Sequence, residues 1–166
     1  VFAAKWAEVI QHWADRYGER VSGWWFDGGY QHIGFNETIA ETYAKAAKHG
    51  NRKAIVTFNP GVKVTRWTQA EDYTAGELNE PFGQVPSNRW LDGSQWHALT
   101  FVGSSWGKRD VRYTDADWAK WVLAVAVNGG AVTLDVGPNY NPDEGPVGSI
   151  APQQLRQLEA IRSAVR

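Results

Sequence analysis

The sequence of 166 residues contains no cysteine, which excludes a disulfide scaffold, thiolate-bound zinc and a cysteine nucleophile. Seventeen Lys and Arg residues nearly balance eighteen Asp and Glu residues, so the net charge is -1. A charge so close to zero gives no indication of nucleic acid or an anionic membrane as a partner. No hydrophobic run approaches the roughly 20 residues of a membrane-spanning helix. These absences predict a soluble chain that binds neither nucleic acid nor a membrane.

Methionine is also absent, and the first residues, Val1 to Trp6, already have the pattern of a helix. No signal-peptide pattern precedes them, so we expect a fragment whose upstream part is missing. Aromatic residues, in contrast, are abundant, with ten Trp, six Tyr and six Phe beside seventeen Gly. This is more aromatic surface than a small core usually needs, and many of the rings fall in segments with loop character.

The order of apolar segments predicts alternating strands and helices. Strands are expected over 21–26, 53–58, 97–102 and 131–136, and helices over 6–17, 36–49, 118–127 and 152–165. Such alternation predicts a parallel sheet, in either an open doubly wound fold or a closed (β/α)8 barrel. No Gly-x-Gly-x-x-Gly follows any strand, which disfavours a dinucleotide-binding sheet. Because a complete barrel takes about 250 residues, we predict an α/β fold class: the C-terminal half of a TIM-like barrel, about four β/α units in one partial domain over 1–166.

Carboxylates near the ends of the first two predicted strands are the candidate catalytic groups. Active sites of such barrels lie at the C-terminal ends of the strands, and Asp27 ends the first strand between aromatic residues and a glycine pair. A carboxylate there can attack an electron-poor carbon, although Asp-Gly is also a common hairpin turn. Glycoside hydrolysis needs a second carboxylate. The polar segment 62–95 supplies candidates that could equally form a solvated acidic loop: Glu71, Asp72, Glu77 and Glu80.

Tryptophans outside the predicted helices suit stacking on the faces of a sugar, with Arg66 or His32 as polar partners. These tryptophans are Trp24, Trp25, Trp67, Trp90, Trp96 and Trp106, whereas core packing is expected for Trp13, Trp118 and Trp121. The four histidines are dispersed without metal-ligand spacing. Asn139, Asn141 and Asp143 alternate as in a calcium loop, but the Gly and Glu that such a loop requires are out of register. We therefore expect no metal and no cofactor.

Five short motifs resemble a known family, the retaining α-L-fucosidases of glycoside hydrolase family 29. Trp24-Trp25-Phe26-Asp27-Gly28 resembles the nucleophile motif of that family, and Ser105-Trp106-Gly107 resembles its Trp-Gly segment. Its closing run, with a glycine pair, a strand ending in Gly-Pro and a Gly-x-Ile, resembles residues 127–130, 136–138 and 148–150. The motifs keep the order of the family and cover nearly the whole chain.

The resemblance implies that Asp27 is the nucleophile of a covalent fucosyl-enzyme intermediate and that Glu77 is the acid/base. Because Gly76 adds a residue before Glu77, Glu71 and Glu80 stay open as alternatives. The sugar-binding residues that it implies are Trp25, Arg66, Trp67 and Trp106. The implied function is hydrolysis of terminal α-L-fucosyl residues from fucosylated glycans or glycoconjugates, without metal or cofactor. A secreted, periplasmic or lysosomal location is expected from the family, and the oligomeric state is open.

Two other functions fit the same residues. One is a non-catalytic fucose-binding or carbohydrate-binding module, or a degenerate homologue that keeps an aromatic pocket without turnover. The other is a different barrel glycosidase that shares Asp27 as nucleophile and differs in substrate. The family's pocket also uses residues from the first half of the barrel, so the fragment alone is expected to be inactive.

Overall fold

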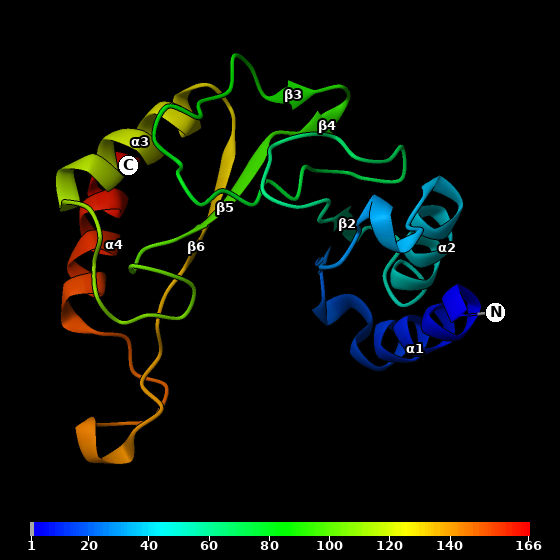
Figure 1. Cartoon of the computed structure of the whole chain (residues 1–166), viewed down its shortest axis with the longest axis horizontal. Coiled ribbons are helices and arrows are strands. Elements are labelled where there is room, and N and C mark those ends of the chain that lie inside the picture. The colour runs from blue at the N-terminus through cyan, green and yellow to red at the C-terminus, as the bar shows by residue number, and fades with distance from the viewer. Residues whose placement is uncertain (1) are drawn as a thin grey trace. The chain divides into compact units, whose positions relative to one another are not determined.

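The computed structural model describes residues 2–166 and has a mixed α/β fold (Figure 1). Its elements follow in the order α1 (Phe2–Tyr17), η1 (Gly18–Arg20), β1 (Gly23–Phe26), η2 (Gln31–Ile33), α2 (Glu37–Ala47), β2 (Ile55–Phe58), β3 (Trp90–Leu91), β4 (Ser94–Gln95), β5 (His97–Phe101), α3 (Asp115–Val127), β6 (Ala131–Asp135), η3 (Pro142–Glu144) and α4 (Pro152–Ala164). Within this range no helix combines the length and the apolar character needed to cross a bilayer.

Two separate parallel strand pairs are present where the sequence predicts one parallel sheet of four strands. β1 pairs with β2, with Phe26 opposite Phe58, and β5 pairs with β6, with Phe101 opposite Asp135. A helix joins the strands of each pair, α2 in the first and α3 in the second. The prediction of strands connected by helical crossovers is therefore confirmed for both pairs. The short antiparallel hairpin of β3 and β4 was not predicted.

The chain divides into two compact units. The first unit runs up to Glu77 and includes Trp90–Trp96, and the second comprises Leu78–Arg89 and His97–Arg166. In the first unit α1 and α2 lie side by side (Figure 1), and their apolar faces cover β1 and β2. Its core contains Ile10, Phe35, Ala40, Ala44, Ala46, Ala47, Val56 and Phe58.

Close backbone contact between α1 and the end of α2 depends on Gly50. A Cβ atom at Gly50 would lie 1.9 Å from the carbonyl oxygen of Ala14, a distance that only a residue without a side chain allows. On the same helix Trp13 was expected in the core, but it is 40% exposed. Ile10 and Ala14 take the buried face of α1, and the Trp13 ring stacks instead on Tyr17 at a centroid distance of 5.7 Å.

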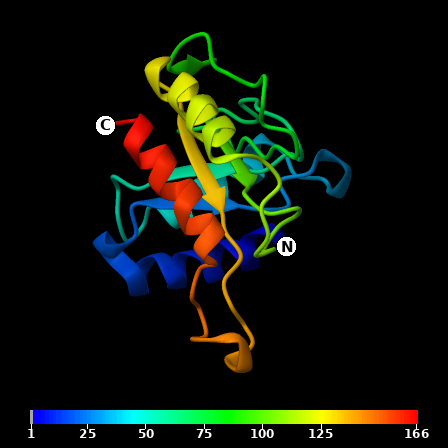
Figure 2. The same ribbon diagram turned by 90° about the vertical axis from the view of Figure 1, so that its left-hand side faces the viewer.

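In the second unit α3 and α4 lie side by side, as Figures 1 and 2 both show. A capping box begins α3, since the Thr114 hydroxyl accepts from the Asp117 N–H and the Asp117 carboxylate accepts from the Thr114 N–H. Trp118 and Trp121 are buried, as predicted. Trp118 packs edge-on against the ring of Phe82, and the ring of Trp121 is tilted to that of Phe82. This packing gives the second unit an aromatic core of its own.

Candidate functional site

The register of β1 and β2 places Asp27 and Asn59 beside each other. The N–H of Asn59 donates to the carbonyl of Phe26 at 2.8 Å, which extends the parallel ladder one step beyond the pair of Phe26 and Phe58. Asp27 and Asn59 are thus the first residues after the C-terminal ends of the two strands. Asp27 is exposed, whereas Asn59 is 0% exposed.

The Asp27 carboxylate is held through one of its two oxygens. Its Oδ1 atom accepts from the Gly28 N–H at 2.8 Å, the Tyr30 hydroxyl at 3.2 Å and the Asn59 Nδ2 at 3.0 Å. Within residues 2–166 the Oδ2 atom accepts no hydrogen bond, so it is available to a ligand. Burial raises the pKa of Tyr30, and the nearby carboxylates Asp27 and Glu77 raise it further. The phenol therefore stays protonated and continues to donate to Asp27.

A strand-like segment after β2 carries Glu77 to the same place. The N–H of Asp72 donates to Val56 at 2.9 Å, the Gln95 N–H donates to Asp72 at 3.0 Å, and the Thr74 N–H donates to Gln95 at 3.0 Å. The segment that begins at Asp72 therefore runs between β2 and β4. Hydropathy alone did not reveal this addition to the first unit.

Two side-chain hydrogen bonds between this segment and β1 fix it just before Glu77. The Tyr73 hydroxyl donates to the carbonyl of Trp24 at 2.9 Å, and the Trp25 indole N–H donates to the carbonyl of Ala75 at 3.1 Å. Gly76 has a φ of 63°, in the left-handed region that a residue with a side chain rarely adopts. The extra glycine noted in the sequence thus gives the chain the turn that precedes Glu77.

Asn59 joins the two carboxylates that the sequence predicted as a pair. Its Nδ2 atom donates to Asp27 Oδ1 at 3.0 Å and to Glu77 Oε2 at 2.5 Å. Because both bonds meet at one nitrogen, the two oxygens are separated by no more than the sum of the two lengths, about 5.5 Å. All three residues belong to the first unit, and Glu77 is half-buried.

Glu71, one alternative for the acid/base, is 3% exposed and is fully engaged by the chain itself. Its carboxylate accepts from the Thr57 hydroxyl and from the N–H groups of Phe58, Trp67 and Thr68. Burial raises the pKa of Glu71, and the four hydrogen bonds oppose that effect. These contacts tie the loop to β2 and leave the carboxylate no free lone pair directed at a ligand.

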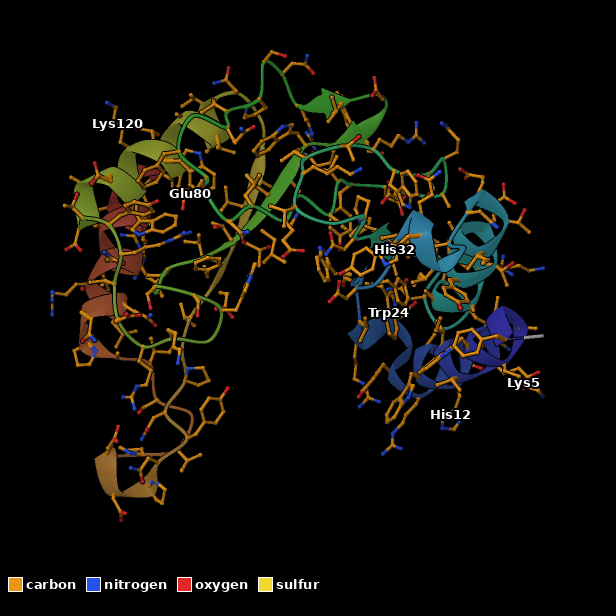
Figure 3. The ribbon with its side chains drawn as sticks, in the orientation of Figure 1. Lys5, His12, Trp24, His32, Glu80 and Lys120 are labelled. Atoms are coloured by element: carbon orange, nitrogen blue, oxygen red, sulfur yellow. The ribbon has the colours of Figure 1, made fainter. Side chains whose placement is uncertain are left out.

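Glu80, the other alternative, lies in the second unit, where Figure 3 shows it beside α3. The Tyr113 hydroxyl donates to its carboxylate at 2.5 Å, and this bond is the main reason that the pKa of Tyr113 is raised. The Glu80 side chain is 79% exposed. The structure thus brings Glu77, and neither alternative, into a hydrogen-bonded group with Asp27.

The four predicted sugar-binding residues have different surroundings. Trp25 and Arg66 use their N–H groups on backbone carbonyls: Trp25 on Ala75, and Arg66 on Thr68, Gln69 and Asp92. Trp67 lines a cavity that is described in the next paragraph. Its ring is half-buried, and the Lys63 ammonium lies over it, 5.4 Å from the centroid. Trp106 belongs to the second unit and packs edge-on against Phe101 at 4.8 Å.

Two cavities of the first unit adjoin the carboxylate site. An apolar cavity of about 690 Å³ reaches Asp27 and Gly28 and is otherwise lined mainly by aromatic and aliphatic side chains of α1, β1 and α2. A more polar cavity of about 420 Å³ is lined by Tyr30, Gln31, His32, Pro60, Lys63 and Trp67. The second cavity has an aromatic ring beside several polar groups, the combination expected from the sequence for a sugar site.

Two contributors to the site were not identified from the sequence, Tyr30 and Asn59. In the sequence Asn59 is only the residue that follows the predicted strand 53–58, in the turn-like run Asn59-Pro60-Gly61. The signal that could have identified it is its position, since it follows the second strand as Asp27 follows the first. No group of three His, Cys, Asp or Glu side chains within residues 2–166 is arranged to hold a metal ion.

Comparison with solved structures defines the fold. The chain superposes on the endo-fucoidan hydrolases MfFcnA4 and MfFcnA9 of glycoside hydrolase family 107 with a TM-score of 0.78 for each. Sequence identities are 21% and 22%, and the match covers 95% of this chain but 29% and 35% of theirs. The chain has a glycoside hydrolase-like fold.

This glycoside hydrolase-like fold is also found in the α-L-fucosidase AlfC from Lactobacillus casei, solved with α-L-fucose as product. The TM-score is 0.65 and the identity 14%, over 96% of this chain and 43% of AlfC. The chain therefore spans less than half the length of the structures that it matches. No family model matches the sequence, and no curated protein matches it. The expected mixed α/β glycosidase-like fold is confirmed at this general level. The structural similarity to the α-L-fucosidase AlfC is weaker than the similarity to the family 107 hydrolases.

Proposed function

We propose that the chain carries the catalytic carboxylates of a retaining glycoside hydrolase that cleaves α-L-fucosyl residues. The observation that carries the proposal is the Asn59 bridge, which keeps Asp27 Oδ1 and Glu77 Oε2 within about 5.5 Å of each other. Retaining glycosidases hold their two carboxyl groups about 5 to 5.5 Å apart, whereas inverting enzymes need about 6.5 to 9.5 Å to admit a water molecule. The spacing in this chain therefore suits a double displacement.

In the first step Asp27 attacks the anomeric carbon through its unoccupied Oδ2 oxygen. The glycosidic bond breaks as Glu77 gives its proton to the leaving oxygen, and a fucosyl ester forms on Asp27. In the second step Glu77 takes a proton from water while the water oxygen attacks the same carbon. This attack releases fucose and restores the Asp27 carboxylate. The Tyr30 hydroxyl and the Gly28 N–H hold the other Asp27 oxygen throughout.

The polar cavity next to this pair supports a sugar as substrate. Tyr30 links the two, because it lines the cavity and also donates to Asp27. The Trp67 ring offers an apolar face for stacking, and Gln31 and His32 offer polar groups for hydroxyls. Fucose is the sugar that we infer, from the motif resemblance together with the fold shared with fucoidan hydrolases and an α-L-fucosidase. In this proposal the two strand–helix–strand units belong to a TIM-like catalytic barrel.

The test uses the complete gene product that carries these residues and an aryl α-L-fucoside as substrate, with fucoidan assayed in parallel. Asp27→Gly should abolish hydrolysis, and azide should restore turnover with formation of the inverted fucosyl azide. Glu77→Ala should slow release of fucose, and azide should instead give the azide of retained configuration, because azide then attacks the fucosyl ester. Glu80→Ala is the matched control and should behave as the wild type does.

Each alternative has its own outcome in this experiment. Full activity of Asp27→Gly would refute the nucleophile assignment, and an inverted azide from Glu77→Ala would refute the role of Glu77. Cleavage of fucoidan without cleavage of the aryl fucoside would place the reaction inside a polysaccharide rather than at its end. Binding of fucose without turnover of either substrate would support the non-catalytic module.

A further inference from the structure

We propose that Asn59 is the positioning residue of the site: one side-chain amide sets both the spacing and the orientation of Asp27 and Glu77. The inference rests on the proposed function, because it assigns Asn59 a part in the same reaction. The evidence is geometric, since a single fully buried nitrogen donates to an oxygen of each carboxylate. Asn59 acts through these two residues.

The orientation of the Asn59 amide follows from its other end. The backbone N–H of Gly61 donates to Asn59 Oδ1 at 3.0 Å. An N–H group can be matched only by an acceptor, so the oxygen of the amide must face Gly61 and the NH2 group must face the carboxylates. The Asn59 backbone is fixed as well, through its bond to the carbonyl of Phe26. Both ends of the residue are therefore set before any ligand arrives.

Neighbouring backbone keeps Asn59 in this place. A Cβ atom on Gly29 would lie 3.0 Å from the Asn59 carbonyl oxygen and 3.2 Å from the Phe58 Cβ. The chain that follows Asp27 thus packs directly against the end of β2. This contact leaves Asn59 little room to move away from the pair.

The Asn59 NH2 group has two hydrogens, one for each carboxylate, and this arrangement suits the charge changes of a double displacement. Before the first step Asp27 is charged and Glu77 holds a proton. In the fucosyl ester Asp27 has lost its charge and Glu77 has gained one, so the total charge of the pair is the same. Asn59 donates one hydrogen to each, and such bonds are stronger to a charged acceptor. The amide therefore stabilises whichever carboxylate is ionised and, having no acidic proton, exchanges none with them.

Asn59→Asp is the primary test, made in the complete gene product and assayed on the aryl fucoside. The new side chain keeps an acceptor for the Gly61 N–H but replaces the NH2 group with an oxygen. We expect kcat to fall about 100-fold, the effect of losing one well-placed donor in other enzymes, while KM changes little. Loss of the donor, and the added negative charge, favour the protonated carboxyls, so both limbs of the pH profile should move to higher pH.

Asn51→Asp is the matched control at the opposite ends of the same strands. The Asn51 amide donates to the carbonyl of Val21 at 3.0 Å and accepts from the Lys53 N–H at 3.0 Å, so the substitution makes the same chemical change. It should lower stability without moving the pH profile. Asn59→Leu, of similar volume and without charge, serves if Asn59→Asp does not fold, and its profile should move in the same direction.

Crystal structures of the wild type and the Asn59 variants give a readout that does not depend on turnover. Separation of Asp27 Oδ1 and Glu77 Oε2 should widen beyond 5.5 Å in either variant. An unchanged separation, or an unchanged pH profile with kcat within twofold of the wild type, would overturn the positioning role. If the wild type cleaves no fucoside, the proposed function fails by itself, and the crystal structures still decide the role of Asn59.

Discussion

Replacing Glu71 with glutamine separates the structural carboxylate of the loop from the proposed acid/base. One Glu71 oxygen accepts from the Thr57 hydroxyl at 3.2 Å and the Phe58 N–H at 2.9 Å. The other accepts from the N–H groups of Trp67 at 2.5 Å and Thr68 at 3.0 Å. Glutamine keeps the shape of the side chain but has only one oxygen, so its NH2 group must face one of these pairs of donors.

The expected cost follows from the donors that lose their acceptor. Whichever way the amide turns, at least one buried backbone N–H is left unpaired. A buried polar group without a partner costs about 1–3 kcal/mol, and an NH2 group pressed against another donor adds to that cost. We therefore expect Glu71→Gln to lower the free energy of unfolding by about 2–4 kcal/mol.

The difference between wild type and Glu71→Gln should also depend on pH. Burial raises the pKa of Glu71 in the folded state, so the folded chain holds this proton more tightly than the unfolded chain does. The contribution of Glu71 is then fully present below the unfolded pKa and declines as pH rises through the folded pKa. Glutamine does not titrate, so the stability difference should be larger at pH 4 than at pH 7.

Urea unfolding of the complete gene product measures both effects, with Glu77→Gln as the control. Glu77 is half-buried and accepts one bond, from Asn59, so its replacement should change the free energy of unfolding by less than about 0.5 kcal/mol while it impairs turnover. Equal urea midpoints for Glu71→Gln and the wild type would refute the structural role. A large loss of stability in Glu77→Gln would refute the idea that Glu71 supports the fold and Glu77 does not.

Two further predictions concern the helices of each unit. Gly50→Ala should destabilise the contact of α1 with the end of α2 by about 2–3 kcal/mol in a thermal or urea unfolding experiment, because its Cβ would overlap the Ala14 carbonyl. Gly23→Ala is the control, since its Cβ would approach Ile55 no closer than 3.4 Å, and an equal loss in both variants would contradict the reasoning. Thr114→Ala should cost about 1 kcal/mol through loss of the α3 cap, whereas Thr114→Ser should keep the cap, and a stable Thr114→Ala would show that the cap contributes little.

The parallel strands could be predicted because their ends are marked in the sequence. Each apolar run stops at polar turn residues, as at Asp27-Gly28 and Asn59-Pro60, and the helices between them have clear apolar faces. The hairpin of β3 and β4 was missed although Asp92-Gly93 is a common hairpin signal. Both residues have positive φ angles, 52° and 89°, as that turn requires. Its strands of two residues each are too short to show a period of two.

The site could be predicted only in part, because its acidic residues look alike in the sequence. Glu71, Glu77 and Glu80 lie within ten residues of one another, and their surroundings depend on contacts far along the chain: Glu71 with β2, Glu77 with Asn59, and Glu80 with Tyr113. The same holds for Arg66, whose guanidinium donates to three backbone carbonyls that its residue type does not reveal. Hydrophobic pattern indicates where strands end, but not which polar group each side chain meets.

The three backbone carbonyls bound by Arg66 have a consequence for ligand association. Ordering a loop costs about 1–2 kcal/mol of backbone conformational entropy for each residue. The Arg66 guanidinium binds Thr68, Gln69 and Asp92 in the folded chain. The loss of backbone entropy therefore occurs during folding and not when a ligand binds. Of the residues that line the polar cavity, Trp67 lies in the chain between Arg66 and Thr68. The backbone at Trp67 is therefore already ordered, and the affinity of a ligand there depends on desolvation and contact rather than on freezing a mobile segment.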